Sequence, residues 1–242
     1  PVANFLRSSA NISFRELLVN LTTSPQRGIN GTAHVFNINA DSMRIDTVRV
    51  NLVEKAHGLT FNGQVTNNRR NPQFVFNTLF DGLVQEHGAS IGVRYFDAKG
   101  NLGLRIGTQA VMADNGINFR LIPSNPTIGY KKFTLNDDNY LFIQDNLRLQ
   151  AKVDLIAEDG TGIKIYSVEQ DSTLLQDLTV SLHRFDLGKL TEVLPYVPSI
   201  TGELNGDYHL VMDEKRQISV ALDMNVKKMT YERSPLGNVA TE

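Results

Sequence analysis

Two segments toward the C-terminal end of the chain alternate apolar and polar residues with a period of two. The apolar side chains fall on even positions in residues 200–212 and again in residues 218–226: Ile200, Leu204, Tyr208, Leu210 and Met212, then Ile218, Val220, Leu222, Met224 and Val226. A period of two places each set on one face of a β-strand. At about 3.3 Å per residue, the second segment predicts a strand roughly 30 Å long. We therefore expect a long sheet with one apolar face and one polar face.

Similar alternation recurs from residue 29 onward, and short polar segments interrupt it. Turn-forming residues occur at 97–101, 136–139 and 158–162, and Asn115-Gly116 is a strong hairpin signal. Strands and turns follow one another about every 8–12 residues, which predicts an all-β protein. Residues 73–87 are ambiguous, because their apolar positions fit a strand at the start and a helix later.

Two short helices are expected within this β-rich pattern. The first, at about residues 13–22, begins with a capping box in which Ser13 precedes Glu16 by three positions. The second, at about residues 186–194, ends at the break that Pro195 introduces. In both places a helix-like segment is followed by a proline, an Ile-x-Gly triplet and alternating strands.

This internal similarity predicts one elongated segment over residues 1–242, with two sub-modules of about 1–185 and 186–242. The chain begins without a methionine and ends shortly after a turn-like Ser-Pro-Leu-Gly at 234–237. We therefore expect it to be an interior or C-terminal fragment of a longer protein.

Charge and composition exclude several classes of function. The 242 residues carry 24 basic and 26 acidic side chains, and no run of Lys or Arg exceeds two residues. This balance argues against nucleic acid as a partner. The absence of cysteine excludes disulfides, thiolate metal ligands and cysteine nucleophiles. No apolar run approaches the roughly 20 residues of a membrane-spanning helix.

The sequence contains no recognisable catalytic or metal-binding pattern. The five histidines lack metal-ligand spacing, and the GxSxG, P-loop and GxGxxG motifs are absent. The acidic pairs Asp137-Asp138 and Glu158-Asp159 lie in turns, where such side chains bond their own backbone. The residues alone therefore identify no catalytic residue, metal site or cofactor site. Because paired carboxylates are separated in space rather than in sequence, a carbohydrate-active β-helix stays open as a third alternative.

The order of several short motifs resembles the TamB family, the AsmA-like translocation and assembly module proteins, in its Bacteroidetes-type branch. The resemblance covers most of the chain from about residue 29. Toward the C-terminal end it rests on Phe185-Asp186-Leu187, Leu190, Leu194-Pro195-Tyr196-Val197-Pro198, residues 200–207, Met229-Thr230-Tyr231 and Leu236-Gly237. Upstream it rests on Ile128-Gly129-Tyr130, Phe133, residues 136–139 and residues 158–163.

This resemblance implies a long antiparallel or mixed sheet that is curled into a folded-over, taco-like or β-helical, hydrophobic groove. It implies a periplasmic protein whose inner-membrane anchor lies outside this chain. The implied function is non-enzymatic: phospholipid transport between the inner and outer membranes, outer-membrane biogenesis and protein secretion. The implied partners are phospholipid acyl chains and an outer-membrane assembly protein of the BamA or TamA type.

The candidate groove residues are the alternating apolar side chains of the predicted strands. They are Ile91, Val93, Tyr95, Leu102, Leu104, Ile106, Ile117, Phe119, Leu121, Leu147, Leu149, Val153, Leu155, Leu204, Tyr208, Leu210, Ile218, Val220, Leu222, Met224 and Val226. The same residues would pack against one another in an ordinary β-sandwich. The second functional alternative is a β-scaffold that binds outer-membrane protein strands or assembly partners by edge pairing.

Overall fold

The computed structural model describes residues 12–26, 28–41, 43–71, 74–168 and 174–241. The chain is all-β, and every strand pairing given for the described residues is antiparallel. It divides into two compact units, Pro1–Arg105 (unit 1) and Ile106–Glu242 (unit 2). Residues 185 and 186, where the sequence predicted a boundary between sub-modules, lie at the end of a strand inside unit 2.

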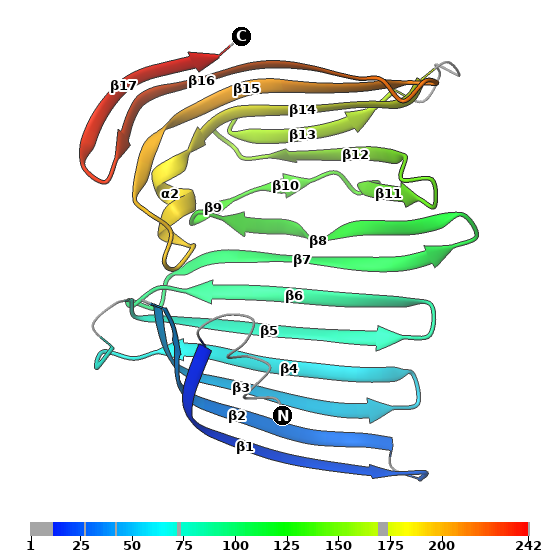
Figure 1. The fold of residues 1–242 in the computed structure, drawn as a ribbon, viewed down its shortest axis with the longest axis vertical. Helices are drawn as coiled ribbons and strands as arrows, with labels where there is room; N and C mark the ends of the chain where they lie inside the picture. The colour runs from blue at the N-terminus through cyan, green and yellow to red at the C-terminus, as the bar shows by residue number, and fades with distance from the viewer. Residues whose placement is uncertain (1–11, 27, 42, 72–73, 169–173, 242) are drawn as a thin grey trace. The chain divides into compact units, whose positions relative to one another are not determined.

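Unit 1 is an antiparallel meander in which each strand pairs with the next (Figure 1). Its strands are β1 (Ile12–Ser24), β2 (Gly28–Ala40), β3 (Met43–Lys55), β4 (Gly58–Asn67), β5 (Phe76–Gln85) and β6 (Gly88–Phe96). Two-residue turns connect β3 to β4 and β5 to β6, and turns of this length permit only antiparallel neighbours. β7 (Leu102–Ala113) runs across the division between the units.

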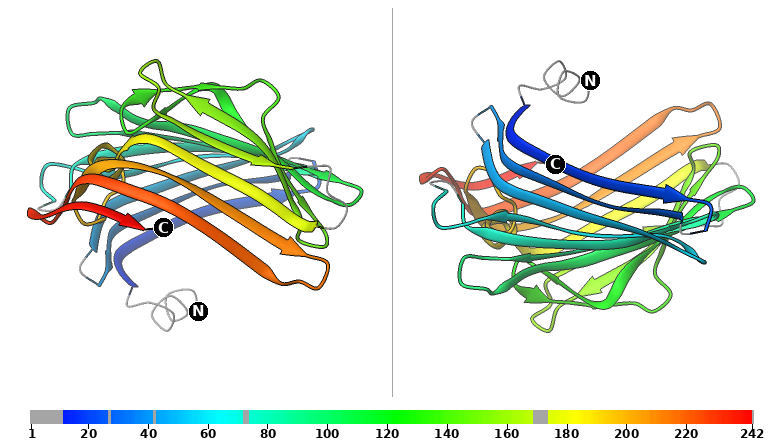
Figure 2. Two further views of the ribbon diagram at one scale, coloured as in Figure 1. Left: turned by 90° about the horizontal axis from the view of Figure 1, so that it is seen from above. Right: turned by 90° about the horizontal axis from the view of Figure 1, so that it is seen from below.

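Unit 2 continues with strands of very different length and one helix. The elements are β8 (Gly116–Ile128), β9 (Lys131–Lys132), β10 (Thr134–Leu135), β11 (Tyr140–Gln144), β12 (Leu149–Ile156), β13 (Gly162–Ser167), β14 (Leu174–Asp186), α2 (Leu187–Glu192), β15 (Ile200–Asp213), β16 (Ile218–Tyr231) and β17 (Ser234–Thr241). β8 pairs with β11, and from β11 to β17 each strand pairs with the next. β15 and β16 run side by side along their length (Figure 2). In neither unit do the described strands close into a barrel.

The predicted turns and the long strand pair are confirmed, and the turns are held by local side-chain hydrogen bonds. Asp97 accepts hydrogen bonds from the backbone N–H groups of Lys99 and Asn101. Asn139 Oδ1 accepts from the backbone N–H of Leu121, which ties the next turn to β8. Such residues favour turns because their short side chains can bond nearby backbone groups. Within the ambiguous range 73–87, residues Phe76–Gln85 form strand β5.

Of the two predicted helices, one was wrong. Residues 13–22 lie in β1, whereas the range 186–194 contains the helix α2, of six residues. In β1 the pairing with β2 satisfies the backbone over twelve residue pairs, and this outweighs a capping signal that is local. The predicted all-β, antiparallel sheet is confirmed for the described residues, and the folding of this sheet into a groove stays a prediction.

In unit 1 the pairing register aligns apolar residues into rows across the sheet. One row runs through Val19, Ala33, Val50, Gly63, Phe80 and Val93. Phe80 lies over Gly63, where a β-carbon would come within 2.2 Å of the ring, and Phe61 lies over Gly82 in the same way. The two glycines therefore make room for the two aromatic rings. The opposite face is polar, with Asn51 bonded to Asn62 and Arg94 to Asp81.

The described part of unit 2 has its core at one end of the sheet, next to α2. Phe133 stacks on Phe185 with the ring planes 10° apart and the centroids 6.0 Å apart. Leu190 of α2 packs against this cluster, and α2 rests on Gly129, where a β-carbon would lie 3.0 Å from the Lys189 backbone. Asp186 caps the helix by accepting from the Lys189 N–H. No helix among the described residues has both the length and the apolar character needed to cross a membrane.

Close to α2, the strands β14 and β16 each carry a bulge, and β15 between them has a residue with positive φ. Arg184, Gly202 and Lys228 adopt φ values of 53°, 138° and 52° at these points. The pairing register shifts there between Leu182 and Phe185 on β14, Thr201 and Glu203 on β15, and Val226 and Met229 on β16. A bulge bends its strand and increases the local twist. The two bulges therefore bend the ends of β14 and β16 where α2 begins.

Candidate functional site

The candidate site is the apolar face of unit 2, which we define by its pairing register. Directly paired residues of antiparallel strands project on the same face. The rows across the sheet are Ile117 with Ile143 and Leu149; Phe119 with Leu141 and Ala151; Val153 with Ile165, Val180, Tyr208 and Leu222; Leu155 with Ile163, Leu182, Gly206 and Met224; and Leu178 with Leu210 and Val220. The face runs from β8 through β11–β16 and includes two polar positions, Ser167 opposite Leu178 and Gln176 opposite Met212. Their side chains bond the backbone of Ala151 and Leu149.

The two ends of this face differ in burial. At the end next to α2, which we call the covered end, the residues exposed by less than a tenth are Phe133, Leu135, Val153, Leu155, Ala157 and Phe185. At the opposite end, which we call the open end, Ile218 and Val220 are 64% and 52% exposed, and Ile117 is 38% exposed. The open end lies at the tips of the hairpins, away from α2. The same face is thus a core at one end and a water-exposed apolar surface at the other.

An apolar pocket of about 210 Å³ lies on this face. It is lined by Thr108, Phe119, Leu121, Asn139, Tyr140, Leu141, Ala151, Val153 and Ile165. Ala151 is only 2% exposed, and its N–H donates to Ser167 Oγ at 3.0 Å. The pocket occurs where this alanine is paired with Leu141, in a region of otherwise large side chains.

Most of the predicted groove residues of unit 2 lie on this one face. The residues that the structure brings together are Ile117, Phe119, Leu121, Leu149, Val153, Leu155, Leu204, Tyr208, Leu210, Ile218, Val220, Leu222, Met224 and Val226. Ile91, Val93 and Tyr95 belong to the apolar face of unit 1. Leu102, Leu104 and Ile106 lie on β7, at the division between the units.

Leu147 departs from the predicted alternation. It lies in the turn between β11 and β12, with a φ of 69° and 77% of its surface exposed. Its backbone N–H donates to the Gln144 carbonyl, which closes the turn. The odd-numbered spacing that connects it to Leu149 is therefore a coincidence of sequence rather than a shared strand.

Sequence reasoning did not select several residues that complete the face. They are Leu141, Ile143, Ala151, Ile163, Ile165, Leu178, Val180 and Leu182. Ile163 and Ile165 carried a short alternation signal that was available in the sequence. The contribution of Ala151 could not be read from the sequence, because an alanine produces a pocket only through the size of its cross-strand neighbours.

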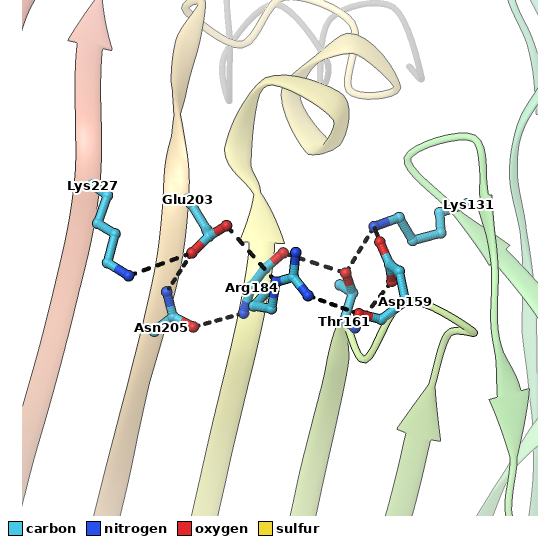
Figure 3. Close-up of polar contacts among 7 residues, drawn as sticks. All are labelled: Lys131, Asp159, Thr161, Arg184, Glu203, Asn205 and Lys227. Atoms are coloured by element: carbon cyan, nitrogen blue, oxygen red, sulfur yellow. Dashed lines mark hydrogen bonds and ion pairs between the residues drawn. The ribbon is translucent and has the colours of Figure 1, made fainter.

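A line of polar side chains crosses the strand ends beside the bulges (Figure 3). Its members are Lys131, Asp159, Thr161, Arg184, Glu203, Asn205 and Lys227. Lys131 Nζ donates to Asp159 Oδ2 and to Thr161 Oγ1 at 2.7 Å each. The Arg184 backbone N–H donates to Asn205 Oδ1 at 2.8 Å. Each cation of the line faces a carboxylate, so we interpret these contacts as structural interactions that hold the neighbouring strand ends together.

Hydrogen bonds from neighbouring residues lower the pKa of three exposed aspartates. The hydrogen bond from Lys131 and those from Thr161 hold the pKa of Asp159 well below its ordinary value. The hydrogen bonds from Lys152 and then Asn136 lower the pKa of Asp138. The side-chain hydrogen bond from Asn101 is the main cause that lowers the pKa of Asp97. All three lie in turns, which agrees with a structural role for these carboxylates.

The described residues contain no cluster of three or more His, Asp or Glu side chains that could hold a metal ion. Comparison of the chain with protein-family models, with curated proteins and with solved structures finds no match.

Proposed function

We propose that the apolar face of unit 2 holds phospholipid acyl chains during lipid transport between two membranes. The observation that carries this proposal is the long apolar face whose open end leaves Ile218 and Val220 64% and 52% exposed. An extended hydrocarbon chain matches a face that is long and mainly apolar, and the polar side chains of Ser167 and Gln176 on it bond the backbone of β12.

The energetics favour an apolar occupant. Burying a Val or Ile side chain is favourable by roughly 1.5–3 kcal/mol relative to its exposure in water. Contiguous exposed apolar surface also promotes association with other apolar surfaces. An acyl chain on the open end would remove water from several such side chains at once, without requiring any catalytic group.

The proposal extends to the protein as a whole through its resemblance to TamB-like proteins. We propose a non-enzymatic, periplasmic segment of an inner-membrane-anchored protein that serves outer-membrane biogenesis together with an assembly protein of the BamA or TamA type. The motif order from residue 128 to residue 237 supports this assignment.

A photo-crosslinking scan tests the lipid proposal directly. A photoreactive amino acid is placed at each position from 218 to 226, and lipid adducts are identified by mass spectrometry after expression in a bacterium with two membranes. We expect phospholipid adducts at Ile218, Val220 and Leu222. Ser219, Ala221 and Asp223 project to the other face and serve as matched controls. Equal capture at odd and even positions, or no capture at any position, would contradict the proposal.

A second candidate function is supported by β17. All eight residues of this strand are exposed, and within the described residues it pairs only with β16. An edge strand of this kind can accept an additional β-strand through backbone hydrogen bonds. Hydrogen exchange of the backbone N–H groups distinguishes the two candidates. A bound strand peptide should slow exchange in β17. Bound phospholipid should slow exchange in β15 and β16 and leave exchange in β17 unchanged.

A further inference from the structure

The apolar pocket beside Ala151 differs from the rest of the unit 2 face because it is concave. It receives side chains from β7, β8, β11, β12 and β13, whereas the open end is formed by strand surface alone. Its volume of about 210 Å³ exceeds the roughly 150 Å³ of an engineered apolar cavity that binds benzene. The pocket is therefore large enough for a short hydrocarbon segment.

The pocket exists because a small residue occupies a position that large residues occupy elsewhere on the face. Ala151 lies directly opposite Leu141, and the next position inward on the same strand is Val153. Phe119 is paired with Leu141 on the other side and forms the opposite wall. A longer side chain at position 151 would project into this space. Ala151 therefore sets the depth of the pocket.

The polar side chains at the rim use their hydrogen-bonding groups on the protein backbone. Asn139 Oδ1 accepts from Leu121 N–H at 2.8 Å, and Asn139 Nδ2 donates to the Asn136 carbonyl at 3.0 Å. Thr108 Oγ1 donates to the Arg120 carbonyl at 3.2 Å. A ligand with a buried charge or amide in this pocket would lose its hydrogen bonds to water without replacement, which is unfavourable. The chemistry thus selects pure hydrocarbon.

We propose that this pocket receives the methyl end of one acyl chain, while the rest of the chain lies along the face. This inference rests on the proposed lipid function and adds the orientation of the bound chain. A glycerophosphate headgroup is excluded from the pocket by the lack of available polar partners. Ala151 is then a specificity-determining residue, because its size sets how far a chain end can enter.

The test uses phospholipids that carry a diazirine either at the methyl end or near the carboxyl end of one acyl chain. With the natural protein, we expect methyl-end adducts on the pocket residues Phe119, Leu141 and Val153, and carboxyl-end adducts elsewhere on the face. Ala151→Phe fills the pocket and should lower methyl-end capture there by about tenfold, since two or so methylene groups lose their burial. Ala221→Phe, on the other face of β16, is the matched control and should capture lipid like the natural protein.

The outcomes separate the two proposals. Capture at the pocket that is equal for both diazirine positions, or unchanged in Ala151→Phe, overturns the pocket inference while the lipid function stands. An absence of adducts on the whole face overturns the lipid function itself. If Ala151→Phe does not fold by circular dichroism, Leu141→Ala decides: an enlarged pocket should capture a branched chain end better relative to a straight one, and an unchanged ratio overturns the inference.

Discussion

The covered and open ends of the unit 2 face carry the same kinds of side chain in the same alternation, yet their environments are opposite. At the covered end Leu155 is 3% exposed, with Phe185 and α2 packed over it. At the open end Ile218 is 64% exposed. The difference depends on what lies above the sheet rather than on the strands. Alternation therefore identifies an apolar face, and only the elements packed against it decide whether that face is a core or a binding surface.

A charge placed in the covered end and a charge placed in the middle of β16 should differ most strongly in effect. Leu155→Arg would bury an unpaired cation in the core, which costs several kcal/mol, so we expect the protein not to fold. Leu222→Arg, in the half-buried middle of β16, should leave the fold intact and abolish acyl crosslinking to residues 218–226. Circular dichroism and the crosslinking scan measure the two effects. If Leu222→Arg unfolds the protein completely, Leu222 belongs to a closed core and the face is not open there.

Truncating one side chain at the covered end and one at the open end should show the same contrast in stability, with a smaller effect. Phe185→Ala removes one ring of a buried stacked pair and should lower the free energy of unfolding by about 3–5 kcal/mol. Val220→Ala, at the open end, should lower it by less than about 1 kcal/mol. Urea denaturation of both variants measures the difference. Similar losses would mean that the two ends are packed alike.

The packing of α2 over the covered end can be weakened by a substitution at Gly129. Alanine there would meet the Lys189 backbone at 3.0 Å and would also adopt a φ of 58°. We expect Gly129→Ala to cost about 1–3 kcal/mol and to increase hydrogen exchange in α2. Gly100→Ala is the control, because its φ is 83° but no atom lies within 4 Å of the added carbon. If both variants lose the same stability, backbone strain alone explains the loss and the contact with α2 contributes nothing.

The smallest effect concerns the pH dependence of the turn at Asp159. A carboxyl whose pKa is lowered by folding stabilises the protein above its unfolded pKa of about 3.9, and this contribution is lost as the pH falls through the folded value. Lys131→Met should therefore lower the melting temperature at pH 5–7, with a difference from the natural protein that shrinks below about pH 4. Lys132→Met controls for the loss of one positive charge. A difference that is constant down to pH 2 would exclude the Lys131–Asp159 pair as its cause.

Much of the fold could be predicted from the sequence. The alternation of residues 200–212 and 218–226 predicted β15 and β16, and the Asp, Asn and Gly clusters at 97–101, 136–139 and 158–162 predicted turns. These signals are local, since side-chain period and turn chemistry act within a few residues. The predicted helix at 13–22 failed for the same reason: its capping signal is local, whereas the pairing of β1 with β2 involves the next strand along the chain.

The candidate site was predictable in part. The alternating residues of β8, β12, β15 and β16 lie on a single face in the structure, because a fixed period determines facing within a strand, and their role in lining a groove stays a prediction. Leu147 was misassigned, since the sequence does not reveal where a strand begins. The pocket beside Ala151 was not predicted, because its walls come from five strands whose register is set by pairing.

The sequence by itself determined that this protein is built from β-strands, where many of them turn, and that long strands carry one apolar and one polar side. Tertiary structure alone decided which apolar rows align across strands, that α2 and the stacked Phe133 and Phe185 cover one end, and that Ile218 and Val220 stay exposed at the other. The physical reason is that alternation is a property of one strand, whereas burial depends on what another part of the chain places over it.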